Sequence, residues 1–256
     1  MTKYETIIDP ASRIVFASDF HLGVPDYNSS LKREKKLVAW LEEEAKKHSS
    51  IYLMGDLFDF WFEYKHVVPK HYVRLLGTLA RLTDNGIFIS VFTGNHDMWL
   101  FDYFEKELNI KIHRNPLFVH AQNKVLMIGH GDGLGPNDYG YKRLKKMFSN
   151  PLLQWFFARL HPNFAFGVAK YFSNKSRIAQ TTEEEFKSLN DEWLWQYCAK
   201  KKNEYPDIDY FIFGHRHLKL DLKVGNNARY INTGTWLEDA NFAVLENGQL
   251  DQKIYV

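Results

Sequence analysis

The chain has 256 residues, 45% of them apolar and 25% charged, with a formal net charge of +2, and this balance excludes disordered and collagen-like proteins. No apolar run approaches the roughly 20 residues of a membrane-spanning helix, and no secretory signal opens the chain. The single cysteine, Cys198, excludes an internal disulfide and a thiolate zinc cluster, and this fits a cytoplasmic protein.

The first 135 residues alternate between strand-like and helix-like segments. Short apolar runs predict buried strands over residues 13–18, 51–54, 87–92 and 124–128. Between them, apolar periodicity predicts a helix over residues 31–48 and a second from Pro69 to a stop near Asn85. Such alternation is typical of an α/β layered fold with crossover connections.

The chain from Asp209 onward has a different pattern. Turn residues separate four short predicted strands, over residues 209–213, 218–224, 228–232 and 242–245. Strands joined by such short links usually pair antiparallel. We therefore expect a mixed sheet, or two sheets packed between helices.

The segment from about residue 137 to 203 reads as mostly helical, divided by Pro151 and Pro162. Thr181 and Glu184 have the spacing of a capping box, which predicts a helix that continues to Tyr197. We interpret the segment as an insertion in one domain that spans residues 1–256.

Five motifs combine Asp, Asn or His, and each follows a predicted strand. They are Asp19-Phe-His21, Gly55-Asp56-Leu-Phe-Asp59, Gly94-Asn95-His96-Asp97, Gly129-His130-Gly131-Asp132 and Gly214-His215-Arg216-His217. Ligands of open α/β sheets collect at the carboxyl ends of strands. The five motifs are therefore expected to converge on one crevice.

The residue types of these motifs predict a metal site. Asp19 and His21 are two residues apart, so on an extended segment both would face one point. Asp56 has two carboxylate oxygens and can bridge two cations. Mixed nitrogen and oxygen ligands suit Mn, Fe, Zn or Ni, and paired cations are a recurrent device for phosphoester hydrolysis. A single histidine at a strand end is more often structural, but the set of five motifs predicts a dinuclear site.

The order of the motifs resembles the calcineurin-like metallophosphoesterase superfamily, from Asp19 to His217. The resemblance implies a β-sandwich of mixed sheets flanked by helices. It implies that one divalent ion is held by Asp19, His21, Asp56 and His217. It implies that a second ion is held by Asp56, Asn95, His130 and His215. His96 would then act at the transition state, and Asp97 would orient it.

The predicted insertion is rich in aromatic and basic residues. Residues 139–172 hold ten aromatic side chains, and residues 137–178 hold eight Lys or Arg against one acidic residue. One interpretation is a helical hairpin that packs on the main domain. Another is an amphipathic cap for acyl chains or the membrane headgroup region, with Lys and Arg meeting phosphates. The remaining chain is net acidic, so we expect no nucleic-acid partner.

A narrower resemblance concerns residues 55–61, 129–138 and 141–155, which are similar to the UDP-2,3-diacylglucosamine diphosphatases of lipid A synthesis. It implies a helical lid, two Mn²⁺ ions, and hydrolysis of UDP-2,3-diacylglucosamine to UMP and 2,3-diacylglucosamine 1-phosphate. It also implies peripheral attachment to the anionic inner face of the cytoplasmic membrane. The candidate substrate-binding residues are Asp138, Tyr141, Arg143, Lys175 and Arg177.

One departure keeps an alternative open. Well-known members of that narrower family have Arg after the metal-binding Asn, where this chain has His96. Arg contacts phosphate as a fixed cation, whereas His can donate a proton. The alternatives are a dinuclear phosphatase or phosphodiesterase for another lipid or nucleotide phosphoester, a nuclease, and a binding scaffold without activity. The scaffold is disfavoured because all seven candidate ligands are present.

Overall fold

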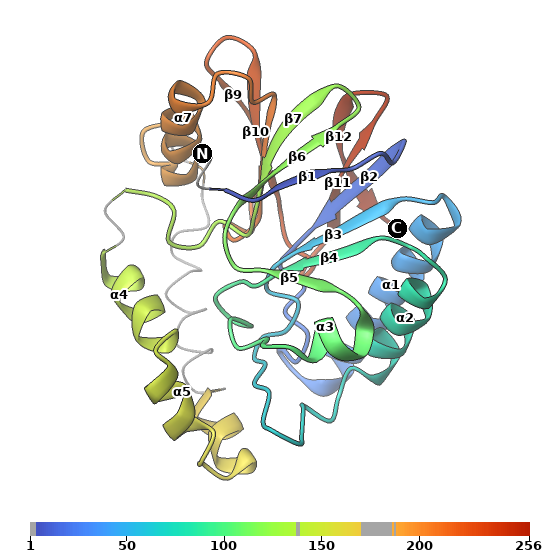
Figure 1. Ribbon diagram of the computed structural model, residues 1–256, viewed down its shortest axis with the longest axis vertical. Coiled ribbons are helices and arrows are strands. Elements are labelled where there is room, and N and C mark those ends of the chain that lie inside the picture. The colour runs from blue at the N-terminus through green and yellow to red at the C-terminus, as the bar shows by residue number, and fades with distance from the viewer. Residues whose placement is uncertain (1–3, 137–138, 170–185, 187) are drawn as a thin grey trace.

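The computed structural model describes residues 4–136, 139–169, 186 and 188–256 (Figure 1). Its centre is a sandwich of two mixed six-stranded sheets. In order, the first sheet contains β1 (Thr6–Ile8), β6 (Leu117–Ala121), β7 (Lys124–Ile128), β8 (Tyr210–Phe213), β10 (Ala228–Thr233) and β9 (Lys219–Val224). The second contains β12 (Gln249–Tyr255), β11 (Ala240–Glu246), β2 (Arg13–Ala17), β3 (Ser50–Met54), β4 (Ile89–Phe92) and β5 (Lys111–His113). The predicted α/β class with mixed sheets is confirmed.

Parallel pairing sets where the strands end. Strands β2 to β5 run parallel in the second sheet, and β7, β8 and β10 run parallel in the first. Parallel neighbours present their carboxyl ends at one edge of a sheet. The loops after β2, β3, β4, β7 and β8 carry the five motifs, so two sheets contribute to one region.

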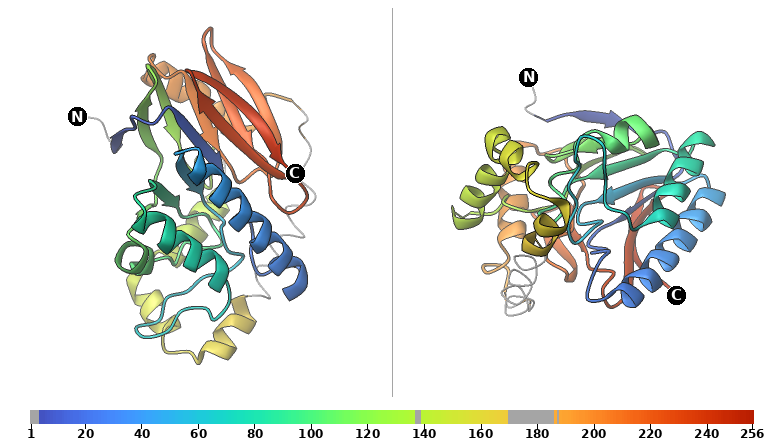
Figure 2. Two further views of the ribbon diagram at one scale, coloured as in Figure 1. Left: turned by 90° about the vertical axis from the view of Figure 1, so that its right-hand side faces the viewer. Right: turned by 90° about the horizontal axis from the view of Figure 1, so that it is seen from below.

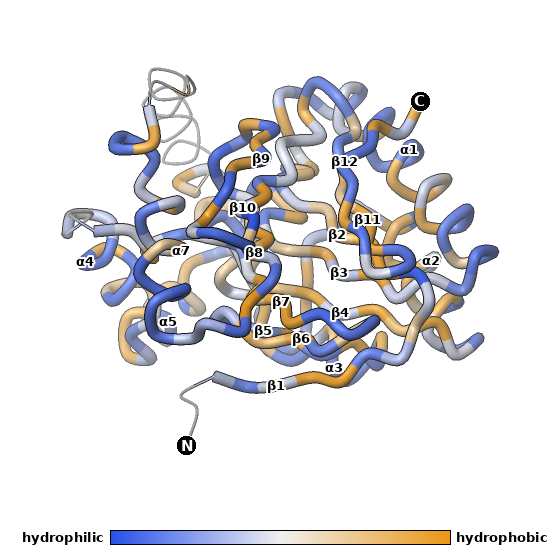
Figure 3. Tube along the Cα trace, turned by 90° about the horizontal axis from the view of Figure 1, so that it is seen from above, coloured by the Kyte–Doolittle hydropathy of each residue, from blue (hydrophilic) through white to orange (hydrophobic). Residues whose placement is uncertain are grey.

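Apolar side chains fill three layers. Between the sheets, Phe16 and Tyr52 of the second sheet pack in one core with Ile212 of the first. Outside the second sheet lie α1 (Tyr27–Lys46), α2 (Val73–Asp84) and α3 (Tyr103–Leu108), as Figure 2 shows. Outside the first sheet, α7 (Trp193–Glu204) buries Leu194 and Cys198. In Figure 3, β4 and β7 are largely hydrophobic, while α1 and α2 alternate, as expected for helices with one buried face.

The element boundaries differ from the predictions where a local contact decides them. Helix α1 begins at Tyr27, earlier than predicted, because the Asp26 carboxylate accepts the N–H groups of Asn28 and Ser29 at 2.8 and 3.0 Å. Helix α2 begins at Val73, beyond Pro69. The sequence patterns missed β1, β5, β6, β12 and α3, most of which are short or lie at a sheet edge.

Two described helices of the predicted insertion lie apart from the sheets, α4 (Tyr139–Phe148) and α5 (Pro151–Phe157), as Figures 1 and 2 show. Residues 162–169 are also helical. Both prolines thus begin a helix, as their fixed φ favours. The helix predicted from Thr181 does not run unbroken to Tyr197, because residues 189–191 form a turn and α7 begins at Trp193. Thr181 and Glu184 lie outside the described residues.

Within the described ranges, no helix has the length and apolar content needed to span a bilayer.

Candidate metal centre

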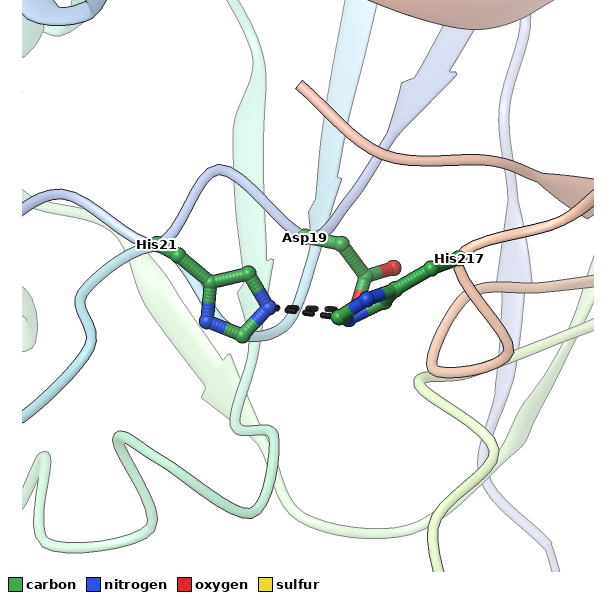
Figure 4. Close-up of side chains that lie close together, drawn as sticks. All are labelled: Asp19, His21 and His217. Carbon is green, nitrogen blue, oxygen red and sulfur yellow. Dashed lines mark hydrogen bonds and ion pairs between the residues drawn. The ribbon is translucent and has the colours of Figure 1, made fainter. Parts of the chain in front are cut away.

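The loops after β2 and β8 bring together a first group of possible ligands, Asp19, His21 and His217 (Figure 4). The Nε2 atoms of the two histidines are 3.0 Å apart. The Oδ1 atom of Asp19 lies 3.3 Å from His217 Nε2 and 3.8 Å from His21 Nε2. Asp19 and His21 are fully buried. Three donor atoms therefore face one point between the two sheets.

A second group consists of Asp56, His130 and His215. His130 Nε2 lies 3.3 Å from Asp56 Oδ2 and 3.3 Å from the side-chain oxygen of Asn95. The same Asp56 oxygen lies 3.8 Å from His21 Nε2 in the first group. Asp56 thus stands between the two groups, where a bridging carboxylate is needed.

The backbone of these loops differs from the extended form that the sequence predicts. Left-handed φ values occur at five possible ligands: Asp19 (57°), His21 (44°), Asp56 (51°), His215 (71°) and His217 (55°). Such conformations are uncommon outside glycine, and they persist where the surrounding structure imposes them. Turned loops, rather than strand alternation, therefore direct these side chains to common points.

Hydrogen bonds fix the orientation of the ligand side chains. His130 Nδ1 donates to the backbone carbonyl of Met54 at 2.9 Å, which leaves Nε2 directed at Asp56. The Oδ2 atom of Asp19 accepts the backbone N–H of His215 at 2.9 Å. Such contacts select the tautomer and the ring plane that a metal ligand needs.

His96 is oriented by Asp59, in place of the predicted Asp97. The His96 Nδ1 atom donates to the Asp59 carbonyl at 3.0 Å and lies 3.7 Å from its carboxylate. The fully buried Asp97 carboxylate instead accepts the backbone N–H groups of Gly94 and Leu57, both at 2.7 Å. Asp97 therefore ties together the loops after β3 and β4, which carry candidate ligands.

Two glycines allow the ligands to pack closely. A Cβ atom on Gly55, whose φ is 93°, would lie 2.5 Å from the ring of His130. A Cβ atom on Gly94 would collide with the Asp56 carboxylate. The glycines that precede two of the candidate ligands are thus required by neighbouring ligand side chains.

Two effects set the pKa values of the clustered side chains: burial, which disfavours their charged forms, and the charges of close neighbours. Burial alone would raise the pKa of Asp19, but His217 outweighs it and lowers that pKa to about 2. Burial would lower the pKa of His130, yet Asp56 raises it to about 10. Burial, with the charge of His130, lowers the pKa of His215 to about 4. Burial, with the charge of Asp56, raises the pKa of Asp97 to about 7.

The donor set fits divalent cations. Among the described residues, the buried atoms Asp19 Oδ1 and His215 Nδ1 have no hydrogen-bond partner. Buried polar atoms are normally satisfied, so such atoms point to a bound group. Carboxylate, amide and imidazole ligands without sulfur suit Mn, Fe, Zn or Ni. A cation would take the place of the protons that these groups otherwise share.

Two buried acidic residues that the motif pattern did not assign support the cluster. Asp132 pairs with Lys145 at 2.6 Å and accepts the Tyr141 hydroxyl at 2.6 Å. Glu192, which is 1% exposed, pairs with Arg216 at 3.1 Å. What identifies these two residues is that each buried carboxylate faces a cationic side chain, and this arrangement is visible only in the tertiary structure.

The candidate substrate-binding residues are only partly within the described chain. The Tyr141 ring lies 6.2 Å from the His215 ring, so α4 reaches the second group. Arg143 is exposed, and no contact between described residues joins it to either group. Asp138, Lys175 and Arg177 lie outside the described residues.

Aromatic side chains of the insertion are divided between two environments. The Phe157 ring packs on Trp99 and Phe62, with centroids 4.7 and 4.8 Å apart, and Trp99 donates to the Phe148 carbonyl at 2.9 Å. Other apolar side chains are 45–62% exposed, namely Leu152, Leu153, Trp155, Phe156 and Phe164. One apolar face therefore docks the insertion, and another stays open to solvent.

The sequence of the chain matches a known protein family and named relatives. The family model described as calcineurin-like phosphoesterase matches residues 12–219. The UDP-2,3-diacylglucosamine hydrolase of Porphyromonas gingivalis is 35% identical, over 93% of this chain and 96% of its own length. The hydrolase of the same name from Edwardsiella ictaluri is 27% identical, over 79% of this chain and 75% of its own. A solved dimetal phosphatase from Danio rerio has a TM-score of 0.47 at 12% identity, covering 96% of each chain. The chain is therefore a metallophosphoesterase of the calcineurin-like phosphoesterase family.

Proposed function

We propose that this metallophosphoesterase hydrolyses the pyrophosphate of UDP-2,3-diacylglucosamine to UMP and 2,3-diacylglucosamine 1-phosphate. The observation that carries the proposal is the similarity to the P. gingivalis hydrolase over 93% of this chain. The unmatched 7% of the chain is shorter than the segment 137–203, so the match must include part of that segment. The aligned part therefore extends into the insertion, which is where a substrate preference would reside.

The proposed cofactors are two divalent cations, with Mn²⁺ the first to test and Fe, Zn or Ni as alternatives. One would be held by Asp19, His21, Asp56 and His217, and the other by Asp56, Asn95, His130 and His215. When bound, such cations would polarise phosphoryl oxygens and lower the pKa of an attacking water. The left-handed loops and the Met54 carbonyl contact hold the ligands in place beforehand.

His96 is proposed to act on the phosphate. Its backbone N–H donates to Asp56 Oδ1 at 2.9 Å, so the residue lies beside the carboxylate between the two groups. Because Nδ1 is committed to Asp59, Nε2 is the ring atom for proton exchange. A water oxygen forms the new P–O bond, the pyrophosphate P–O bond breaks, and the departing oxygen takes up the negative charge or a proton from His96.

The insertion is proposed as the lid that receives the diacyl half of the substrate. Its exposed apolar side chains, among them Trp155, Phe156 and Phe164, offer a surface for acyl chains or for the headgroup boundary of a membrane. Tyr141 reaches the second group and would meet the sugar phosphate, as would Asp138, Arg143, Lys175 and Arg177. Peripheral contact with the anionic inner membrane surface follows from the same face.

The presence of His96 favours one alternative, a dinuclear phosphatase or phosphodiesterase for another lipid or nucleotide phosphoester. A histidine at this position can protonate a poor leaving group, which a phosphomonoester requires more than a pyrophosphate does. The lid surface applies to either substrate class if the leaving group carries acyl chains.

One experiment separates these functions. The metal-stripped protein is reloaded with Mn²⁺ and given UDP-2,3-diacylglucosamine beside an aryl phosphate, and UMP release is followed. Mn²⁺-dependent UMP release with slow aryl phosphate turnover supports the proposal. Aryl phosphate turnover without UMP release rejects it in favour of the alternative. Asp56→Asn, which alters both groups, should abolish either activity, whereas the exposed Asp251→Asn should retain it.

A further inference from the structure

A cavity of about 810 Å³ shares part of its lining with a small cavity at the second group of candidate ligands. Its walls come from the turn between β5 and β6, the loop 133–136, the first turn of α4 and one face of α7. A volume of this size is that of a small-molecule site. None of the seven candidate metal ligands is among its lining residues.

The cavity borders the second group of candidate ligands. A small cavity of about 30 Å³ has His130 and Asp132 in its lining. Arg114, Asn115 and Leu134 line both this small cavity and the large one. A phosphate held at the second group would thus lie next to the wall of the cavity.

The cavity has an excess of positive charge. The Arg114 guanidinium donates to the backbone carbonyls of Met98 and Leu100, and the Lys142 ammonium donates to that of Gly135. Carbonyl oxygens satisfy these donors without neutralising them. Lys200 adds an exposed cation at the rim.

The acidic residue of the wall, Glu5, is compensated. It pairs with Lys111, and it lies 3.2 Å from His113. The charge balance therefore favours an anionic ligand, such as one that carries a phosphate.

The remaining lining suits a nucleobase. Asn115 and Gln196 present side-chain amides, which can both donate to and accept from the edge of a base. Tyr197 also lines the cavity; its ring packs against Phe213, and the Lys201 ammonium lies over it. Base stacking on aromatic rings and amide contacts to base edges are how proteins recognise unstacked bases.

We propose that this cavity binds the nucleoside monophosphate half of the substrate, a uridine phosphate. The proposal rests on the pyrophosphate hydrolysis proposed above. Helix α4 separates the two halves: Lys142 in its first turn lines the cavity, whereas Phe148 in its last turn contacts Trp99 beside the aromatic face. The polar nucleotide and the apolar lipid would then leave the metal centre in different directions.

Photo-crosslinking locates the nucleotide without requiring turnover. The full-length protein is irradiated with 5-iodo-UMP, and adducts are mapped by mass spectrometry, with unlabelled UMP as competitor. We expect competable adducts in the peptides that contain residues 112–116 or 196–201. Competable adducts confined to other peptides would overturn the proposal, and so would labelling that UMP does not compete.

Substitutions test the same surface by kinetics. Lys200→Glu and Asn115→Asp change exposed side chains of the cavity, and Lys253→Glu makes a matched charge change on β12 of the other sheet. We expect both cavity variants to raise the inhibition constant of UMP and the KM of the nucleotide substrate at least about tenfold. All constants of Lys253→Glu should stay near the native values.

The outcomes distinguish this proposal from the proposed function. If UMP is released normally and the cavity variants leave both constants unchanged, the cavity inference is wrong and the hydrolase assignment stands. If the lipid nucleotide is not hydrolysed but 5-iodo-UMP labels the cavity, the hydrolase assignment is wrong and the cavity remains a nucleotide site.

Discussion

His96 shows how one side chain depends on a neighbour that is distant in sequence. Its ring is held by Asp59, which lies on the loop after β3, while the adjacent Asp97 is occupied by backbone N–H groups. The Asp59 carboxylate also lies 3.9 Å from Nδ1 of His21. One acidic residue therefore influences both a candidate ligand and the proposed proton donor.

Asp59→Asn should lower kcat about 10- to 100-fold while the metal content stays at the native level. The variant keeps the backbone carbonyl that accepts from His96 and removes only the negative charge beside the ring. Steady-state kinetics and metal analysis, with Asp251→Asn as control, measure this, and a native kcat in Asp59→Asn contradicts the role.

Among the elements, α7 is the helix that links the metal centre to the outer face of the first sheet. Its cap residue Glu192 pairs with Arg216, which lies between His215 and His217, and accepts the Tyr230 hydroxyl at 3.3 Å. The ring of the next residue, Trp193, lies 5.7 Å from the ring of His215. Helix α7 thus contacts the loop that carries His215 and His217 through Glu192 and Trp193.

Glu192→Gln should weaken Mn²⁺ binding about 10- to 100-fold, because a positioning contact of the histidine loop loses its charge. Titration calorimetry of the metal-stripped protein gives the dissociation constant directly. Glu107→Gln changes an exposed residue of α3 and serves as the matched control. Native Mn²⁺ affinity in Glu192→Gln would show that the contact serves packing alone.

The end of α1 is joined to β2 by a buried ion pair. The side chain of Glu44 is 2% exposed, and it accepts from Arg13 at 2.8 and 3.1 Å and from Ser49 at 2.8 Å. Burial would raise the pKa of Glu44, but these hydrogen bonds outweigh it and lower that pKa. A lowered folded-state pKa gives stability above the unfolded-state value, and this stability is lost as the pH falls.

Glu44→Gln should reduce the free energy of unfolding by about 2 kcal/mol at pH 7, because it removes the buried negative charge opposite Arg13, which keeps its contact with Glu246. The difference from the native protein should shrink as the pH falls below about 4, where the glutamate of the unfolded chain is protonated. Urea unfolding at several pH values measures both quantities. A difference that stays constant down to acidic pH would contradict the assigned pKa direction.

At the scale of the whole molecule, the group of Asp19, His21 and His217 and the group of Asp56, His130 and His215 each combine residues from both sheets. Asp19 and His21 follow β2 of the second sheet, and His217 follows β8 of the first. Asp56 follows β3, and His130 follows β7 of the opposite sheet. A bound cation would therefore connect the two halves of the sandwich at their loop edge.

Metal removal should accordingly lower the thermal midpoint. Mn²⁺ at 100 times its dissociation constant stabilises the native state by about 2.7 kcal/mol, which raises Tm by about 5 to 10 °C in a chain of this size. Calorimetric scans with EDTA and with Mn²⁺ provide the measurement. Asp56→Asn should show a much smaller shift, and an equal shift in that variant would place the stabilising cation elsewhere.

The sequence by itself determined the parts of this protein that depend on local patterns. Apolar runs located β2, β3, β7 and β8, and the motifs at strand ends located the residues that form the two groups. The strand predictions were confirmed because a strand's burial and the turn after it are both encoded in neighbouring residues. The clustering followed because parallel strands end at a common edge.

Only the tertiary structure decided which distant residues meet. The orientation of His96 by Asp59, the pairing of Glu192 with Arg216, and the cavity between residues 112–116 and 196–201 all join segments far apart in the chain. Such contacts arise from sheet order and helix docking, which minimise exposed apolar area over the whole molecule. No window of sequence contains that information, because the partners that satisfy each buried charge are supplied by other elements.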